Sequence, residues 1–553
     1  MSVSQSTTTS YRWAARGDVN AFFGLMLDNI GDMILMASLL VGAFGMPSEF
    51  VLTKMIPGTA VGVLVGDLIF TVMAFQLARK TGRSDVTAMP LGLDTPSTFG
   101  AVFLIIGPAY AAATNRGLET TEAARHAWFL GVTMLLASGL FKLGCAFVSG
   151  LIRKIVPRAG LLGSLAAIAL VIISFLPLID IAAQPIAGFI ALAIILMTLT
   201  ARWELPGNVP GALGGVAVGT IVYYLMHVLG YGPGLGADGG APPSGLQVML
   251  PMPIADWQVW FQANWREALT YLPVAIPLAL ATVVGGIDCT ESASAAGDDY
   301  PTGQIIAGEG FSTLIGGLFG GVIQSTPYIG HPAYKAMGAR AAYTLATALF
   351  VGGAGVLGYF DWIFHVIPKP VIFPILIFVG LEITAQSFQA TARRHNPAVA
   401  LACVPAQAYL ALITLHQVLP ETGKPFDQLS PALQRWVQTD LILANGFIVT
   451  SLLWATTLTH LIEGKVKAAA ATVGLAAVFS WFGIIHSPLP SAPILPPSEV
   501  IVRLEKEGRA EAARAQTPYH TTAAYAGIAL SLLAISRFGK PPAPGSHDDP
   551  VAV

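Results

Sequence analysis

Long apolar runs alternate along the chain with short polar or turn-rich segments. Two examples are FFGLMLDNIGDMILMASLLVGAF, from Phe22 to Phe44, and VIFPILIFVGLEI, from Val371 to Ile383. A helical run of about 20 such residues crosses a hydrocarbon core about 30 Å thick. Because runs of this kind recur throughout, the pattern predicts an all-α polytopic membrane protein.

Basic residues between the runs set an expected orientation, because short loops rich in Lys and Arg mark the cytoplasmic side. Two turn-rich loops, Gly230–Gly245 and Glu421–Arg435, are assigned to the outside. Placing the basic segments in the cytoplasm and these two loops outside gives a cytoplasmic N-terminus. Seven membrane-spanning segments then lie before about Leu229, and seven more begin at about Leu269. An odd number of spans per half inverts the second half, so we expect a 7+7 inverted repeat. The basic segments are Ala78–Arg83, Arg153–Arg158, Thr391–His395, and Lys465 with Lys467.

The same placement divides the chain into five parts. We expect the last part to carry one or two additional apolar helices, separated by an amphipathic surface helix at Ser498–Gln516. The parts are a cytoplasmic tail at 1–19, the first repeat at 20–229, an extracytoplasmic loop at 230–268, the second repeat at 269–466, and a C-terminal extension at 467–553.

Spans 3 and 10, one in each half, are interrupted in the same way. The sequences are VTAMPLGLDTPSTFGAVFLIIG at Val86–Gly107 and GVIQSTPYIGHPAYKAMGA at Gly321–Ala339. Thr95 and His331 each precede a proline, which fits an N-cap followed by proline at the first helical position. Each interruption therefore predicts a short extended piece leading into a half-helix that starts inside the bilayer. The alternative is a pair of ordinary proline kinks in packed helices.

Half-helices that begin in mid-membrane create a particular kind of site. Their unpaired backbone N–H groups are tolerated only where protein or a wet cavity covers them. Two such N-termini facing each other form a polar, partly positive site near the midplane. Paired interruptions at corresponding positions therefore indicate the substrate site of a transporter.

Composition supports the membrane assignment and excludes several classes of function. Of the 553 residues, 54% are hydrophobic and 11% are charged, whereas a soluble domain averages about 25% charged. The polar first ten residues lack the apolar core of a signal peptide. Cys145, Cys289 and Cys403 are scattered, so neither a disulfide framework nor a metal site is indicated. No Walker-type signature, hydrolase motif or nucleic-acid-type basic run occurs, and we expect no cofactor.

Three segments of the second half resemble a known family. They are STPYIGHPAYKAMGARAAYTLATALF, PLALATVVGGIDCTESASAAG and GEGFSTLIGGLFGG. The first is similar to the corresponding stretch of the AzgA-type adenine/guanine permeases, within the xanthine/uracil/ascorbate permease family. The resemblance implies fourteen helices in two inverted repeats, a core domain that carries the substrate, and a gate domain that moves against it. It also implies coupling to protons or sodium.

The resemblance places some of the family's site residues on this chain. The acidic residue of the eighth helix falls on Asp288, and the residues before the first half-helix fall on Asp94 and Thr95. The second substrate-contacting carboxylate, at the start of the tenth helix, falls on Gly330, with His331 beside it. The missing carboxylate is a departure that brings the nucleobase specificity into question.

Several polar residues near these breaks have both a functional and a structural explanation. Asp288, with Glu291 one turn later, is a candidate for substrate or proton binding, or it faces water at the cytoplasmic end. His331 either contacts substrate or caps the half-helix. Tyr328 either stacks on a flat ring or packs. Lys335, four residues after His331, either attracts an anionic ligand or extends to the cytoplasm.

Carboxylates also occur within the first spans. Asp28 and Asp32 are one helical turn apart in LMLDNIGDM, with Asn29 between them. Two carboxylates at this depth repel each other unless one is protonated or a cation lies between them. We therefore assign Asp28, Asp32 and Glu291 to ion coupling, the alternative being solvated residues near an interface. Asp67 is likewise embedded and is expected to partner a nearby polar group.

These observations predict a secondary active transporter of the plasma (inner) membrane and not an enzyme. The expected substrate is a small planar solute such as a purine or pyrimidine nucleobase, moved together with H⁺ or Na⁺. The weaker alternative within the same fold is a carrier of inorganic or organic anions such as sulfate or bicarbonate, which the missing carboxylate at Gly330, beside His331 and Lys335, would suit. We expect lipid to surround the protein and, by analogy, two copies of the chain to form a homodimer. The predicted substrate-binding residues are Asp288, Tyr328, Gly330, His331, Asp94 and Thr95.

Overall fold

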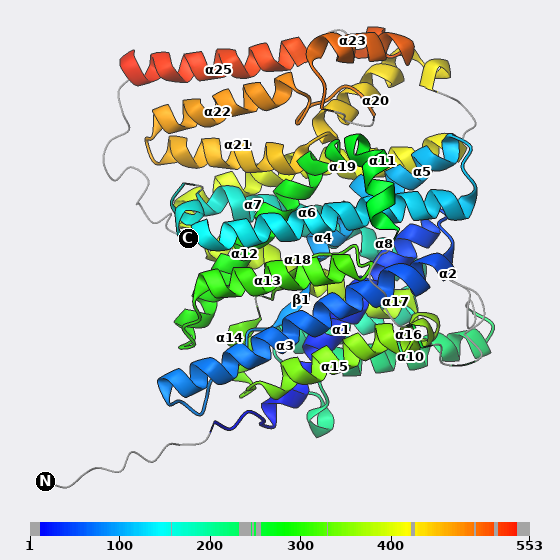
Figure 1. The fold of residues 1–553 in the computed structure, drawn as a ribbon, viewed down its shortest axis with the longest axis vertical. Helices are drawn as coiled ribbons and strands as arrows, with labels where there is room; N and C mark the ends of the chain where they lie inside the picture. Colours follow the sequence, from blue (N-terminus) through cyan, green and yellow to red (C-terminus); the bar gives the residue numbers. More distant parts are fainter. Residues whose placement is uncertain are drawn as a thin grey trace, which may run out of the picture. The chain divides into compact units, whose positions relative to one another are not determined.

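The computed structural model describes residues 11–155, 157–231, 245, 248–249, 256–328, 330–421, 426–490, 494–513 and 518–538. Nearly all regular structure in these ranges is helical (Figure 1). Ten of the described helices are long and apolar enough to cross a membrane, and the number reaches twelve if two bent helix pairs each count as one span. The chain is therefore a multi-pass membrane protein, as the apolar runs predicted.

Seven helical segments precede the long loop after Leu229 in the described part of the chain. Three π-helical stretches, Val51–Met55, Ala101–Ile106 and Ala169–Ile173, join shorter helices into longer segments. The segments are α1 (Gly17–Gly42), α2 (Ser48–Phe50) with α3 (Ile56–Thr81), α4 (Thr95–Gly100) with α5 (Gly107–Asn115), α6 (Thr120–Ile155), α7 (Arg158–Ile168) with α8 (Phe175–Ala183), α9 (Pro185–Ile195), and α10 (Gly211–Val228).

Seven further segments follow a separate helix, α11 (Trp257–Leu269), which lies in the stretch expected to be a loop. Two sets of seven segments agree with the predicted 7+7 architecture. Most of the expected external loop at 230–245 lies outside the described residues. The segments are α12 (Leu272–Ala295), α13 (Thr302–Leu318), α14 (His331–Ala336), α15 (Ala342–Val356) with α16 (Tyr359–Val366), α17 (Lys369–Ile372) with α18 (Pro374–Gln389), α19 (Asn396–Glu421), and α20 (Pro431–Ala444) with α21 (Phe447–Ile462).

Two of these segments bend sharply at glycines. The axes of α15 and α16 differ by 93° and those of α20 and α21 by 68°. Gly358 and Gly446, at the two bends, have φ of +74° and +73°, a left-handed conformation that residues with a Cβ rarely adopt. The bends are therefore fixed by the sequence at these two positions.

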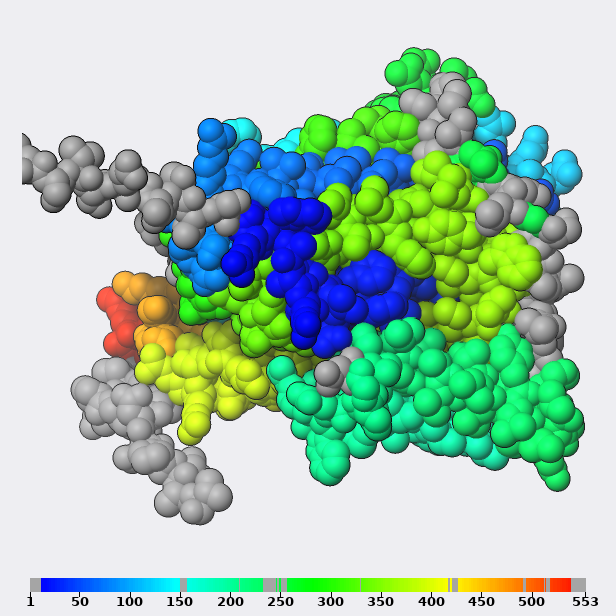
Figure 2. Space-filling view, turned by 90° about the horizontal axis from the view of Figure 1, so that it is seen from below, coloured from blue at the N-terminus to red at the C-terminus, as the bar shows by residue number. Residues whose placement is uncertain are grey.

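One compact unit contains most of residues 11–150, 176–268 and 278–378. Within it α3 packs against both α13 and α15. Helix α1 packs against α15 and α10, and Figure 2 shows the dark blue start of the chain next to the teal segment that contains α10. Glycines allow the closest approach, because a Cβ added at Gly62 of α3 would lie 3.3 Å from the Cα of Gly316 in α13. Glycines of the spans thus allow tight helix packing.

The other compact unit contains 151–175, 269–277 and the described residues from 379 onward, so each unit draws on both halves of the sequence. Its helices α7, α19 and α21 pack on one another. Helix α21 also packs on α22 (Val466–Trp481), and α22 packs on α25 (Pro518–Phe538). Both helices lie after Lys465, in the part of the chain where one or two additional apolar helices were expected. Between them, α23 (Pro497–Lys506) buries Val500 and Leu504, and α24 spans Ala510–Ala513.

Candidate functional site

The two predicted interruptions lie side by side. Strand β1 (Leu91–Leu93) pairs with β2 (Ser325–Pro327) in an antiparallel ladder whose central pair is Gly92 with Thr326. The ladder continues at both ends, because the N–H of Asp94 donates to Gln324 (2.9 Å) and that of Tyr328 to Pro90 (2.8 Å). The two broken spans therefore meet, which favours paired half-helices over separate proline kinks.

Antiparallel pairing also fixes the directions of the two half-helices. Helix α4 begins just after β1 and α14 shortly after β2, so they leave opposite ends of a ladder about 10 Å long, with both N-termini toward it. Helix α4 continues through α5 as one 21-residue segment. Helix α14 has six residues and ends before Gly338, whose φ of +82° stops the helix.

The N–H groups on the outer edge of β1 donate to side chains of neighbouring helices. The N–H of Leu91 donates to Asp67 Oδ1 on α3 (3.2 Å), and the N–H of Leu93 donates to Asn29 Oδ1 on α1 (3.0 Å). An unpaired strand edge is not tolerated in a membrane interior. Asp67 and Asn29 are therefore embedded because they complete the hydrogen bonding of β1, which identifies the polar partner expected for Asp67.

Side chains from three helices donate hydrogen bonds to the carbonyl groups on the outer edge of β2. The Ser325 carbonyl accepts from Lys142 Nζ on α6 (2.9 Å) and from Thr313 Oγ1 on α13 (3.4 Å). The Pro327 carbonyl accepts a weaker bond from Cys289 Sγ on α12 (3.4 Å). Sequence reasoning identified Cys289 as a scattered thiol only, and its spatial role depends on a residue far away in the chain.

A buried ion pair adjoins this edge. Lys142 Nζ lies 2.8 Å from Glu309 Oε1 on α13, and neither side chain has any exposed surface. A Cβ added at Gly286 of α12 would lie 2.9 Å from Glu309 Oε2, so α12 closes over the pair. Sequence reasoning missed both residues, although each is a charge within an apolar run, FKLGCAF and GEGFSTLIGG.

The start of α4 carries two buried acidic groups. Asp94 is the N-cap, accepting at Oδ2 from the N–H of Ser97 (2.8 Å), so the cap lies one residue before the predicted Thr95. A carboxylate accepts this bond well, and Pro96 is tolerated at the second helical position because its missing N–H falls in the unpaired first turn. Thr95 instead donates its hydroxyl to Asp32 Oδ2 on α1 (3.0 Å).

The carboxylates predicted for ion coupling lie at two different depths of burial. Asp28 and Asp32 are 3% and 0% exposed, and Oδ1 of each is buried without a hydrogen-bond partner. Glu291, the third of them, lies at a half-buried position of α12, one turn after Asp288, a predicted substrate-binding residue that is also half-buried. The structure thus brings Asp32, Thr95 and Asp94 together, while the substrate and coupling roles of these residues remain predictions.

His331 and Lys335 point to a carboxylate that sequence reasoning did not consider. Asp298, in the loop between α12 and α13, has an Oδ2 that lies 2.6 Å from Lys335 Nζ and 3.3 Å from His331 Nε2. Arg83 Nη1 lies 3.1 Å from its Oδ1, and the N–H of Thr87 donates to Oδ2. The cap of α14 is Gly330, without a side-chain bond, and not His331.

Opposing effects set the ionisation of Asp298. Burial raises the pKa of this carboxyl, but hydrogen bonds from the imidazole, the ammonium group and a backbone N–H outweigh burial and leave the pKa below its usual range. Asp298 is therefore an anion that holds His331 and Lys335 on one side and the segment before β1 on the other. This arrangement ties both residues to a loop at one end of α14.

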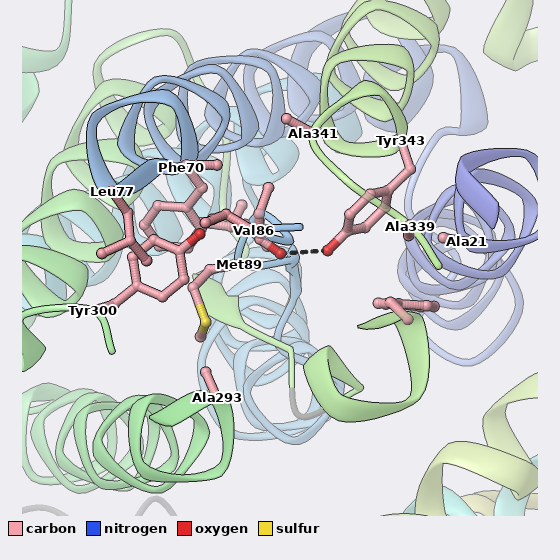
Figure 3. Packing of buried hydrophobic residues seen from close by; sticks show 14 of the residues in the cluster. Ala21, Phe70, Leu77, Val86, Met89, Ala293, Tyr300, Ala339, Ala341 and Tyr343 are labelled. Atoms are coloured by element: carbon pink, nitrogen blue, oxygen red, sulfur yellow. Dashed lines mark hydrogen bonds between the residues drawn. The ribbon is translucent and has the colours of Figure 1, made fainter. Parts of the chain in front are cut away.

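Aromatic side chains surround the position of the missing carboxylate. The rings of Tyr328 and Tyr334 stack at 6.1 Å, and Tyr334 contacts Tyr343. The Tyr343 hydroxyl donates to the Ala88 carbonyl, the hydrogen bond drawn from Tyr343 in Figure 3. A Cβ at Gly330 would lie 2.6 Å from Tyr328 Cε1. Residue 330 thus has no room for a side chain in this arrangement. The described residues contain no group of three or more His, Cys, Asp or Glu placed to hold a metal ion.

Comparisons with known proteins place the chain near solved transporters. No family model matches it, and no curated protein matches its sequence. The transmembrane domain of a cyanobacterium bicarbonate transporter, BicA, is 16% identical, with 73% of this chain and 97% of that chain covered and a TM-score of 0.46. SLC26A9 is 12% identical (72% and 65% covered, TM-score 0.48), and the murine Slc26a9 anion transporter in its inward-facing state is 12% identical (72% and 66% covered, TM-score 0.47).

The expected membership of the xanthine/uracil/ascorbate permease family is wrong. No model of that family matches the chain, and the similar structures above are titled as bicarbonate and anion carriers. The physical reason lies in the residues behind the resemblance. Pro332 lies in the first turn of half-helix α14, and glycines such as Gly316 let α3 and α13 approach, so these residues reflect the geometry of a broken span and its packing. Such residues are required by this packing whatever solute the site binds.

Proposed function

We propose that the chain is a secondary active transporter of a small inorganic anion of the bicarbonate or sulfate type. The observation that carries this proposal is the position of Lys142. Its ammonium group donates to Ser325, the residue that pairs with Leu93 immediately before the start of α4. The ammonium group, paired with Glu309 in this conformation, therefore lies beside the N-terminus of a 21-residue helical segment, where backbone N–H groups already favour anions.

The surroundings of the second half-helix disfavour a nucleobase. Recognition of ring N–H groups needs a carboxylate or a similar acceptor, and the corresponding position is Gly330, closed by the ring of Tyr328. A small oxyanion needs donors instead, and a buried ammonium with helix N–H groups supplies them. This chemistry supports the anion alternative over the planar solute expected from the sequence.

Buried carboxylates near the ladder support coupling to a cation. Asp28, Asp32, Asp94 and Glu309 are each at most 8% exposed, while Lys142 is the one fully buried Lys or Arg side chain among the described residues. Several negative charges without counter-ions are unfavourable in a membrane interior, so H⁺ or Na⁺ must neutralise part of them. We place the protein in the plasma membrane with a cytoplasmic N-terminus, on the basis of its basic loops.

Uptake by proteoliposomes tests the proposal. We expect radiolabelled sulfate, chloride or bicarbonate to accumulate, and uracil and adenine to be excluded. Lys142→Met should abolish anion uptake, whereas Lys142→Arg, which keeps the charge, should retain part of it. Accumulation of a nucleobase with no anion uptake would overturn the assignment.

A further inference from the structure

The contacts of Lys142 suggest how anion binding is controlled. Its Nζ is shared between the Glu309 carboxylate (2.8 Å) and the Ser325 carbonyl (2.9 Å). Among the described residues, Lys142 is the only cation within ion-pair distance of Glu309. The positive charge next to the start of α4 is therefore already neutralised by a carboxylate, and an anion must compete with that carboxylate for it.

We propose that Glu309 is the proton-binding group that decides whether Lys142 is available to the transported anion. This inference rests on the proposed function and names its coupling ion and coupling residue. A proton adds to a carboxylate oxygen of Glu309, and the ion pair with Lys142 is lost. The anion then replaces the carboxylate as the counter-ion of the ammonium group. On the other side of the membrane the anion and the proton leave, and the ion pair forms again.

The charges that face Glu309 fit this exchange. Helix α6 presents Lys142 and Cys145, α12 presents Cys289, and the start of α4 presents Asp94. Asp94 is the only other acidic side chain of this set. Lys142 opposes protonation until an anion takes over as its partner. Proton binding and anion binding therefore favour each other, which is the requirement for symport.

Asp28 and Asp32 do not fit this role. In the described residues no Lys, Arg or His lies within ion-pair distance of either carboxylate, so protonating them releases no cation. Asp32 is bonded to Thr95 at the start of α4, and protonation there changes the half-helix, not Lys142. Glu309 is the carboxylate whose protonation directly creates an anion-binding charge.

The net charge moved follows from the exchange. One proton enters with each anion, so a monovalent anion crosses without net charge transfer, and a divalent anion carries one negative charge. Both side chains are 0% exposed, so the pair is closed off in this conformation and binding requires an opening that exposes Lys142 Nζ. Sulfate and chloride keep their charge between pH 5.5 and pH 8, which makes them suitable probes.

The test uses the purified full chain and Glu309→Gln, which mimics the protonated residue. In wild type, sulfate or chloride uptake should fall at least about tenfold from pH 5.5 to pH 8, whereas uptake by Glu309→Gln should be independent of pH and of the proton gradient. Thermal stabilisation by the anion at pH 8 should be larger in Glu309→Gln than in wild type. Glu122→Gln, the same change at an exposed position of α6, should behave as wild type.

The possible outcomes separate the two proposals. If wild type neither binds nor transports these anions, the proposed function fails. If wild type transports them but Glu309→Gln keeps the wild-type pH profile, or merely loses stability without a change in that profile, the coupling role fails alone. If Glu309→Gln does not fold, a pH indicator in weakly buffered wild-type protein decides. About one proton should be taken up per anion bound, and the absence of proton uptake overturns the inference.

Discussion

Removal of the positive charge of Lys142 gives the sharpest test of how the core is held together. Lys142→Met keeps a long apolar side chain but leaves the Glu309 carboxylate buried without a counter-ion. Loss of one member of a buried pair typically destabilises by about 3–5 kcal/mol. The folding equilibrium should therefore shift by about two to four orders of magnitude, since each 1.4 kcal/mol is tenfold.

A double variant shows whether this loss comes from the pair. In Lys142→Met/Glu309→Leu no charge remains, and replacing a whole buried pair by apolar residues is often neutral or stabilising. Ser325 still has Thr313 as a hydrogen-bond donor at 3.4 Å. We therefore expect the double variant to recover most of the stability that the single variant loses.

The assay is reversible unfolding in mixed detergent micelles, followed by circular dichroism. The deficit of Lys142→Met should also shrink between pH 8 and pH 5, because a proton can neutralise the isolated carboxylate at low pH. The reasoning is refuted if the single variant is as stable as wild type, or if the double variant is as unstable as the single one.

Three further predictions concern the surroundings of the ladder. Asn29→Leu should lower the free energy of unfolding by about 1–3 kcal/mol, because the N–H of Leu93 loses its acceptor; Asn29→Asp keeps an acceptor, and equal losses in both variants would contradict the explanation. Gly330→Ala should lower the melting temperature, because the new Cβ would lie 2.6 Å from Tyr328, and adding Tyr328→Ala should restore it; a lack of rescue would show that the contact is not the cause. The pKa of Asp298 is lower in the folded chain than its ordinary value near 3.9, so its contribution to stability is present above that value and is lost as pH falls through the lower folded pKa. Thermal unfolding between pH 7 and pH 3 should show a smaller acid destabilisation in Asp298→Asn, and parallel curves would disprove this contribution.

The sequence predicted the features that depend on local pattern. Apolar runs of membrane-spanning length became helices, and the matched proline–glycine interruptions became the paired strands and the half-helices α4 and α14. The cap of α4 was misplaced by one residue, because proline is acceptable at either of the first two helical positions and the spacing alone does not distinguish them.

Contacts between segments far apart in the sequence could not be predicted from the local pattern of residues. The pairing of Lys142 with Glu309, and of Asp298 with His331 and Lys335, depends on how helices far apart in sequence pack. A charge in an apolar run indicates that a partner exists, but it does not identify the partner. The family resemblance failed for a related reason, because the matching prolines and glycines describe backbone geometry and carry little information about the solute.

The ladder between β1 and β2 limits how this protein can change shape. Its strands share backbone bonds, extended by those of Asp94 with Gln324 and Tyr328 with Pro90, and their outer edges are fastened to neighbouring helices. Separating β1 from β2 would leave several backbone N–H and C=O groups without hydrogen-bond partners in the membrane interior. Each such group costs several kcal/mol. Transport must therefore carry α4 and α14 as a single body, and a disulfide engineered across the strands should leave turnover intact.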